Sequence, residues 1–182
     1  MGKKGDKDGL EIERRFLLAN VPNLSRYKNV VDYSIEQHYI EPPVEGQVYR
    51  LRTQCEVLRK DLEASPGKAE YFRTTKESVS HGIVKEVEHK ISKNKYLEEL
   101  YGAINNKKIL GSIFKQRTVV KHKNLTWEID KFRNIHLIIA EVELDDLDSL
   151  KKLPEFINKV SIMEVTGVKE LSNYSLAKKY KF

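Results

Sequence analysis

Residues 11–17 read E-I-E-R-R-F-L, and their alternation of charged and apolar side chains is typical of a β-strand. Successive side chains of an extended strand point to opposite faces. Glu11, Glu13 and Arg15 therefore share one face, and the residues between them share the other. Such a charged face is stable against water or against oppositely charged partners on neighbouring strands.

The same alternation recurs along the chain, with aromatic and β-branched residues between the charged ones. It predicts eight strands, at residues 10–18, 33–41, 47–56, 69–78, 83–91, 113–121, 124–132 and 137–144. The charged faces carry doublets: Arg50 with Arg52, Thr74 with Lys76, Glu86 with Glu88, Lys115 with Arg117, Glu128 with Asp130, and Glu141 with Glu143. Like charges on one face repel unless cations or bases lie between them.

A closed barrel with a polar lumen accommodates these faces. Eight strands enclose room for side chains or one small ligand, and their apolar faces then point outward, under helices. Helical periodicity predicts helices at residues 93–106, 147–160 and 172–179, with Pro154 inside the second. We expect an α+β, mainly β fold: a closed eight-stranded antiparallel barrel with the helices outside or at its ends. Residues 56–68 are expected to form an extended hairpin.

Composition limits the functional classes. A chain of 182 residues predicts about one domain, here residues 10–182 after a disordered tail at residues 1–9. Lys and Arg number 33 and Asp and Glu 27, a net charge of +6 that permits an anionic ligand. An RNA-binding barrel would show exposed aromatics between its bases, whereas here bases alternate with carboxylates, so we expect no nucleic acid partner.

The cysteine count and the hydropathy limit the cellular compartment that we expect for the protein. The single cysteine, Cys55, rules out an internal disulfide and a cysteine-based zinc site. No apolar run approaches the roughly 20 residues of a membrane span. We expect a cytoplasmic protein with no membrane partner, and a homodimer is left open.

Taken in order, these motifs resemble the CYTH family, the triphosphate tunnel metalloenzymes. The resemblance runs over Glu11-x-Glu13-x-Arg15, Gln37-x-Tyr39-Ile40, Arg50-x-Arg52, Thr74-x-Lys76, Gly82 with Glu86-x-Glu88, Lys115-x-Arg117, Glu128-Ile-Asp130, Glu141-x-Glu143, Glu164-Val-Thr166 and Lys169. It implies an eight-stranded barrel whose tunnel binds a triphosphate and a divalent metal.

The resemblance implies a hydrolase that cleaves the terminal phosphoanhydride of inorganic tripolyphosphate or of a nucleoside or organic triphosphate. It assigns Mg²⁺ or Mn²⁺ to Glu11, Glu13, Asp130, Glu141 and Glu143, with Glu86, Glu88 and Glu128 as supporting tunnel carboxylates. It assigns the phosphates to Arg15, Arg50, Arg52, Lys76, Lys115, Arg117 and Lys169. Arg15 and Tyr39 form the expected catalytic pair. The alternatives are a non-catalytic polyphosphate or nucleotide binder, a thiamine triphosphatase, and a class IV adenylate cyclase.

Two positions depart from the family pattern. Arg15 replaces the signature Lys, and Arg does not lose its proton in proteins, so proton handling by a pair with Tyr39 must differ here. If the residue only neutralises phosphate, Arg adds a bidentate contact. Val84 stands where the family often has Arg, and Lys85 beside it takes the opposite face of the strand.

Overall fold

Nine strands dominate the computed structural model, which describes residues 10–60, 63–80 and 83–180. The strands are β1 (Leu10–Leu18), β2 (Val30–Ile40), β3 (Val48–Lys60), β4 (Glu63–Ser80), β5 (Ile83–Ile91), β6 (Ile109–His122), β7 (Leu125–Phe132), β8 (Ile138–Glu143) and β9 (Ser161–Glu164). The helical elements are α1 (Lys93–Asn105), α2 (Glu155–Asn158), the 3₁₀ turn η1 (Lys169–Leu171) and α3 (Asn173–Lys179). No helix among the described residues is long and apolar enough to cross a membrane.

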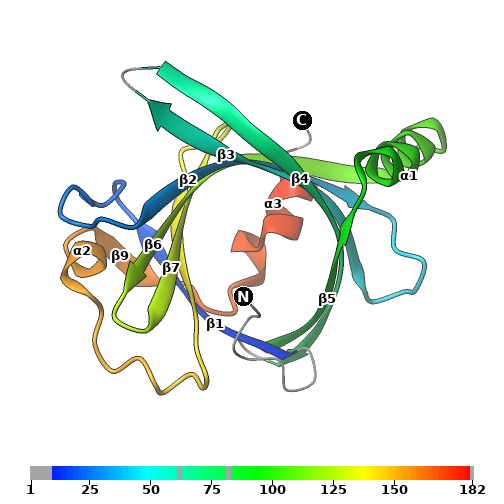
Figure 1. The fold of residues 1–182 in the computed structure, drawn as a ribbon. Helices are drawn as coiled ribbons and strands as arrows, with labels where there is room; N and C mark the ends of the chain where they lie inside the picture. Colours follow the sequence, from blue (N-terminus) through cyan, green and yellow to red (C-terminus); the bar gives the residue numbers. More distant parts are fainter. Residues whose placement is uncertain (1–9, 61–62, 81–82, 181–182) are drawn as a thin grey trace.

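The strands close into a barrel, seen along its axis in Figure 1. Their order is β5-β4-β3-β2-β6-β7-β8-β1, and pairing of β5 with β1 completes the ring. Every pairing is antiparallel. One edge of β1 is shared, because residues 10–12 pair with β5 and residues 16–18 pair with β9. The predicted closed eight-stranded barrel is confirmed.

The segment after β8 differs from the prediction. The structure has only the short helix α2 where the periodicity predicted a helix over residues 147–160. Pro154 holds extended backbone and the helix begins directly after it, because a proline disfavours helix in the residue that precedes it. Strand β9 was not predicted, since its four residues alternate too briefly to give a signal. The predicted tail at residues 1–9 and the motif residue Gly82 lie outside the described residues.

Apolar side chains on the outward face of the strands form one part of the core. Trp127 is fully buried with Phe16 and Val142, and Phe156 of α2 packs against the Trp127 ring at 6.1 Å between centroids. Helix α1 covers a second outward cluster and lies outside the ring in Figure 1. The alternation therefore places the apolar faces under helices, as predicted.

Helix α3 closes one end of the lumen. Its Leu176 and Ala177 pack against Tyr39, Ile113 and Ile139. Ile113 and Ile139 lie two residues before Lys115 and Glu141, so they share the lumen face of their strands. Figure 1 shows α3 inside the ring of strands. The tunnel therefore has an apolar end against α3, and its charged residues lie beyond that end.

Gly111 of β6 makes this close approach of α3 possible. A Cβ at Gly111 would lie 2.1 Å from the carbonyl oxygen of Ala177, a backbone atom that cannot rotate away. We expect Gly111→Ala to lower the free energy of unfolding by about 2–3 kcal/mol, the scale of overpacking a tight core. Urea denaturation checks this.

Gly102 of α1 supplies the matched control for Gly111. A Cβ there meets nothing within 4 Å, so Gly102→Ala should raise stability by about 0.5–1 kcal/mol through helix propensity alone. Equal effects of the two substitutions would contradict the packing of α3 against β6.

Candidate active site

The lumen brings together the charged faces of seven barrel strands. The bases are Arg15, Arg50, Arg52, Lys76, Lys115 and Arg117, and the carboxylates are Glu11, Glu13, Glu86, Glu88, Glu128, Asp130, Glu141 and Glu143. Ion pairs between strands far apart in sequence join most of them. The sequence predicted this gathering, and carboxylates outnumber bases among these residues by two.

A buried ion cluster lies on the wall formed by β6, β7 and β8. Asp130 accepts two bonds from Arg117, from Nε at 2.7 Å and from Nη2 at 2.6 Å, and also pairs with Lys115. Arg117 further pairs with Glu128 and donates to Glu141 at 3.3 Å. Asp130 and Lys115 have no exposed surface. The two cations hold the pKa of Asp130 well below its usual range, against the effect of burial.

The opposite wall, on β3, β4 and β5, has a looser arrangement. Glu88 accepts from Arg52 Nη2 at 2.9 Å, from Thr74 Oγ1 at 3.0 Å and from Arg50 Nη2 at 3.3 Å. Arg50 Nη2 also donates to Thr74 Oγ1 at 3.1 Å. Glu88 therefore faces two guanidinium groups, and Glu86 Oε1 lies farther away, at 3.6 Å from Arg50 Nη2.

Two donors of this wall have no partner among the described residues. The Nε atoms of Arg50 and Arg52 are buried without a hydrogen bond, a condition that is costly for a buried donor. Burial lowers the pKa of Arg52 to about 10, and the adjacent Arg50 charge adds to this. The aromatic ring of Phe72 lies 4.6 Å below the Arg52 guanidinium. The wall carries an excess of positive charge that an anion with several acceptors would neutralise.

Lys76 links this wall to β1. Its Nζ donates to Glu11 Oε2 at 3.2 Å and pairs with Glu86. The two carboxylates hold the pKa of Lys76 above its usual value against burial. Lys76 therefore contacts both Glu11 of β1, a predicted metal ligand, and Glu86 of β5.

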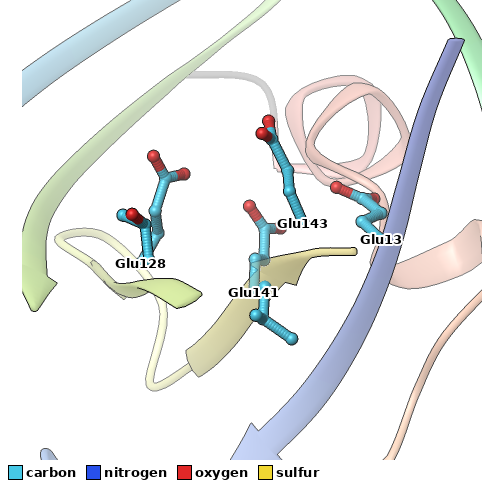
Figure 2. Close-up of a pocket in the computed structure, with 6 residues that line it drawn as sticks. Glu13, Glu128, Glu141 and Glu143 are labelled. Atoms are coloured by element: carbon cyan, nitrogen blue, oxygen red, sulfur yellow. The ribbon is translucent and has the colours of Figure 1, made fainter. Parts of the chain in front are cut away.

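Four carboxylates surround a small pocket beside these walls. Figure 2 shows Glu13, Glu128, Glu141 and Glu143 around it, and it encloses about 50 Å³. Glu13 is opposite Glu143 in the strand register, and Glu128 is opposite Glu141. Like charges directly opposite one another destabilise a sheet, so this pocket favours a cation.

Burial also disfavours the negative charge of the β1 carboxylates Glu11 and Glu13. It raises the pKa of Glu11 and of Glu13 to about 7, and for Glu13 the Glu141 charge adds to the effect. These carboxylates are therefore crowded with too little positive charge. Hard oxygen donors of this kind are the ligands that Mg²⁺ and Mn²⁺ take, so the residues fit the divalent metal that the resemblance implies.

The carboxylates do not yet converge as a metal centre. No three acidic, histidine or cysteine side chains in the described part of the chain are grouped closely enough to hold a metal ion. The reason is that Glu141 is drawn to Arg15 at 2.9 Å and Glu128 to Arg117. A metal here would compete with these bases for the carboxylates.

The predicted catalytic pair lies near the closed end of the tunnel. Arg15 donates from Nε to Glu141 and from Nη2 to the Leu171 carbonyl at 3.0 Å. The buried Tyr39 ring packs against Tyr174 of α3 at 5.6 Å between centroids, and burial raises the pKa of its hydroxyl. Both residues therefore contact the segment that closes the tunnel.

Some contacts of the site were not predicted. The Thr74 hydroxyl and the Leu171 carbonyl take part in it, and Phe72 supports Arg52. Thr74 and Phe72 share the lumen face of β4 by alternation, whereas a backbone carbonyl gives no sequence signal. Lys169, predicted to bind phosphate, is exposed on η1, and no ion pair within the described ranges joins it to the tunnel.

Solved structures with the same fold were found, whereas no family model and no curated protein matches the sequence. The inorganic triphosphatase NE1496 is 26% identical, with 92% of this chain and 94% of that one covered at a TM-score of 0.55. The PH1819 protein from Pyrococcus horikoshii OT3 is 19% identical, with 82% and 85% covered and a TM-score of 0.55.

A third structure shares the barrel in a different setting. A chain of the Schizosaccharomyces pombe Mediator head module is 11% identical, with 86% of this chain and 100% of that one covered and a TM-score of 0.52. The fold alone therefore does not decide the activity, and the residues of the lumen must carry the argument.

Proposed function

Because this chain forms a CYTH-like barrel, we propose that it is a metal-dependent triphosphatase. The substrate is a short phosphate chain, either inorganic tripolyphosphate or the triphosphate of a nucleoside or organic compound. The observation that carries the proposal is that one lumen holds both the unpartnered guanidinium donors of Arg50 and Arg52 and a carboxylate-rich pocket. The likeness to inorganic triphosphatase NE1496 supports it.

The charge balance of the lumen supports metal dependence. A triphosphate carries several negative charges and would enter a lumen in which carboxylates already outnumber bases. Divalent cations remove that repulsion by neutralising both sets of oxygens. Glu11, Glu13, Glu141 and Glu143 would hold the metal, whose chemistry is to neutralise phosphate oxygens and to lower the pKa of a bound water.

The side chains of this chain supply binding and orientation. Arg50 and Arg52 present guanidinium groups that match phosphate oxygens, and Lys76 adds a point charge beside Glu11. The apolar end against α3 limits how far a phosphate chain enters. In such a site, positioning and electrostatic stabilisation provide most of the rate enhancement.

The reading as a non-catalytic binder stays open for a specific reason. Arg15 stands where a titrating Lys would serve a proton transfer, and the barrel also occurs in the Mediator head module. A turnover assay separates the two readings. Phosphate release is measured from tripolyphosphate, ATP and thiamine triphosphate with Mg²⁺, Mn²⁺ or EDTA. Metal-dependent release from one of them supports the triphosphatase, whereas stabilisation by tripolyphosphate without release favours the binder.

Metal stabilisation is expected to depend on pH. The pKa values of Glu11 and Glu13 are raised, so the folded protein binds protons there more tightly than the unfolded chain does. Their contribution to stability therefore declines as pH rises from about 4.5 to about 7, and protons compete with a metal below pH 7. The rise in melting temperature on adding Mg²⁺ should be larger at pH 8 than at pH 6. An equal rise at both values would contradict metal binding by these carboxylates.

A further inference from the structure

Glu88 has the position and contacts of a bound anion. Its carboxylate accepts from three donors on two strands, at 2.9 Å from Arg52, 3.0 Å from Thr74 and 3.3 Å from Arg50. A terminal phosphate group bound to the same wall would use the same donors, because guanidinium and hydroxyl groups donate to phosphate oxygens as they do to carboxylates. The Thr74 hydroxyl has a single proton, so a phosphate that accepts it displaces Glu88 from that donor.

The surroundings show that this carboxylate only partly satisfies the wall. Glu88 brings one negative charge to two guanidinium groups, and Glu86, which also pairs with Lys76, lies farther from Arg50, at 3.6 Å from Nη2. The Nε atoms of Arg50 and Arg52 have no hydrogen-bond partner among the described residues. The Glu88 side chain retains 15% of its surface exposed, and its three rotatable bonds allow the carboxylate to swing away. A phosphate group has more oxygens and more charge to offer the same donors.

Asp130 on the other wall provides the contrast. Its side chain is 1% exposed, both of its oxygens accept from Arg117, and Lys115 lies against it with no exposed surface. Withdrawing that carboxylate would remove from the fully buried Lys115 the carboxylate against it and would leave Arg117 to Glu128 and Glu141, which is strongly unfavourable for buried cations. Compared with Asp130, the more exposed Glu88 is the carboxylate that an entering anion can replace.

We propose that Glu88 is a built-in competitor of the substrate: it occupies a phosphate position on Arg50, Arg52 and Thr74 and is displaced when a triphosphate binds. The inference rests on the proposed function, since it assumes that the phosphate chain binds this wall. In this role Glu88 keeps the basic wall neutralised in the free protein and weakens the binding of anions with fewer charges. It is a specificity-determining residue, distinct from a metal ligand.

Calorimetric titration with sodium tripolyphosphate in EDTA tests the inference without turnover. Glu88→Gln should bind tripolyphosphate about tenfold more tightly than the wild type, because the donors no longer exchange one anion for another. Glu77→Gln removes the same charge at an exposed position of β4 and should stay within about twofold of the wild type. Glu88→Asp serves as the second variant in case Glu88→Gln does not fold. It keeps the charge on a shorter side chain, and a smaller gain in affinity is expected from it.

Thermal denaturation supplies a second readout. Without ligand, Glu88→Gln should melt below the wild type, since Arg52 loses the Glu88 charge and Arg50 keeps only the more distant Glu86. Tripolyphosphate should raise the melting temperature of this variant by more. If the wild type binds and both Glu88 variants bind equally or more weakly, Glu88 only orients the arginines and the inference is overturned. If neither the wild type nor any variant binds or hydrolyses tripolyphosphate, in EDTA or with Mg²⁺, the proposed function fails and the inference fails with it.

Discussion

Replacing Asp130 with Asn is expected to lower the free energy of unfolding by about 3–5 kcal/mol, the largest stability effect of any lumen carboxylate. The change removes the carboxylate that neutralises both Lys115, which is fully buried, and Arg117, which is 8% exposed. Urea denaturation at pH 7 measures it. The control is Glu128→Gln, because Glu128 also pairs with Arg117 but is 37% exposed, and a loss below about 1 kcal/mol is expected there.

Acid denaturation gives an independent check on Asp130. Its folded pKa lies below its unfolded value, so its contribution is fully present above about pH 4 and is lost as pH falls towards the folded pKa. The wild type should lose stability over that range, and Asp130→Asn should lose less. Parallel curves for the two proteins would show that Asp130 does not hold the buried cluster together. Asp130 was also predicted as a metal ligand, and with both oxygens engaged by bases that role stays a prediction.

Replacing Glu13 with Gln is expected to reduce metal-dependent triphosphate hydrolysis at least a hundredfold, since even residues that only support metal ligands are worth 10- to 100-fold. Glu13 lies opposite Glu143 and beside the carboxylate pocket. Steady-state phosphate release with Mg²⁺ at pH 8 measures the loss.

The same variant should not lose stability in EDTA. The pKa of Glu13 is raised to about 7 by burial and by Glu141, so at pH 8 an uncharged amide removes repulsion from the folded protein. We expect its metal-free melting temperature to equal or exceed that of the wild type. A variant that loses both activity and stability would indicate that Glu13 is a structural partner of Arg15 and not a metal ligand.

The faces of the strands could be predicted from sequence because alternation has a period of two. Within each strand, a charged residue that points inward has the charged residue two positions away pointing inward as well. Partners across the lumen could not be predicted in this way. The choice of Glu88 for Arg50 and Arg52, and of Asp130 for Lys115, depends on strand register and on closure of β5 against β1.

The region after β8 shows where local patterns fail. Leu150, Leu153 and Phe156 have helical spacing, yet the first two reach the core from irregular chain and only Phe156 belongs to a helix. Tertiary packing holds Leu150 and Leu153 against the core, although local helix propensity would predict a helix for this segment. Strand β9 is specified by its pairing with β1, a contact distant in sequence.

The sequence shows that Arg15 replaces the signature Lys, but it does not predict which groups Arg15 contacts. Its guanidinium joins Glu141 of the carboxylate pocket to the Leu171 carbonyl ahead of α3. A lysine has a single nitrogen and would not span both acceptors with the geometry of a guanidinium. The replacement of the signature Lys therefore links the predicted metal site to the closed end of the tunnel, and a proton-handling role with Tyr39 stays a prediction.

The most direct test of the triphosphatase is ³¹P NMR of tripolyphosphate incubated with the protein and Mg²⁺ at pH 8. Cleavage of a terminal phosphoanhydride predicts that orthophosphate and pyrophosphate appear in equal amounts. Neither product should form with EDTA or with Glu13→Gln. Unchanged tripolyphosphate in the presence of Mg²⁺ and a folded wild-type protein that binds it would contradict the triphosphatase and leave a binding protein.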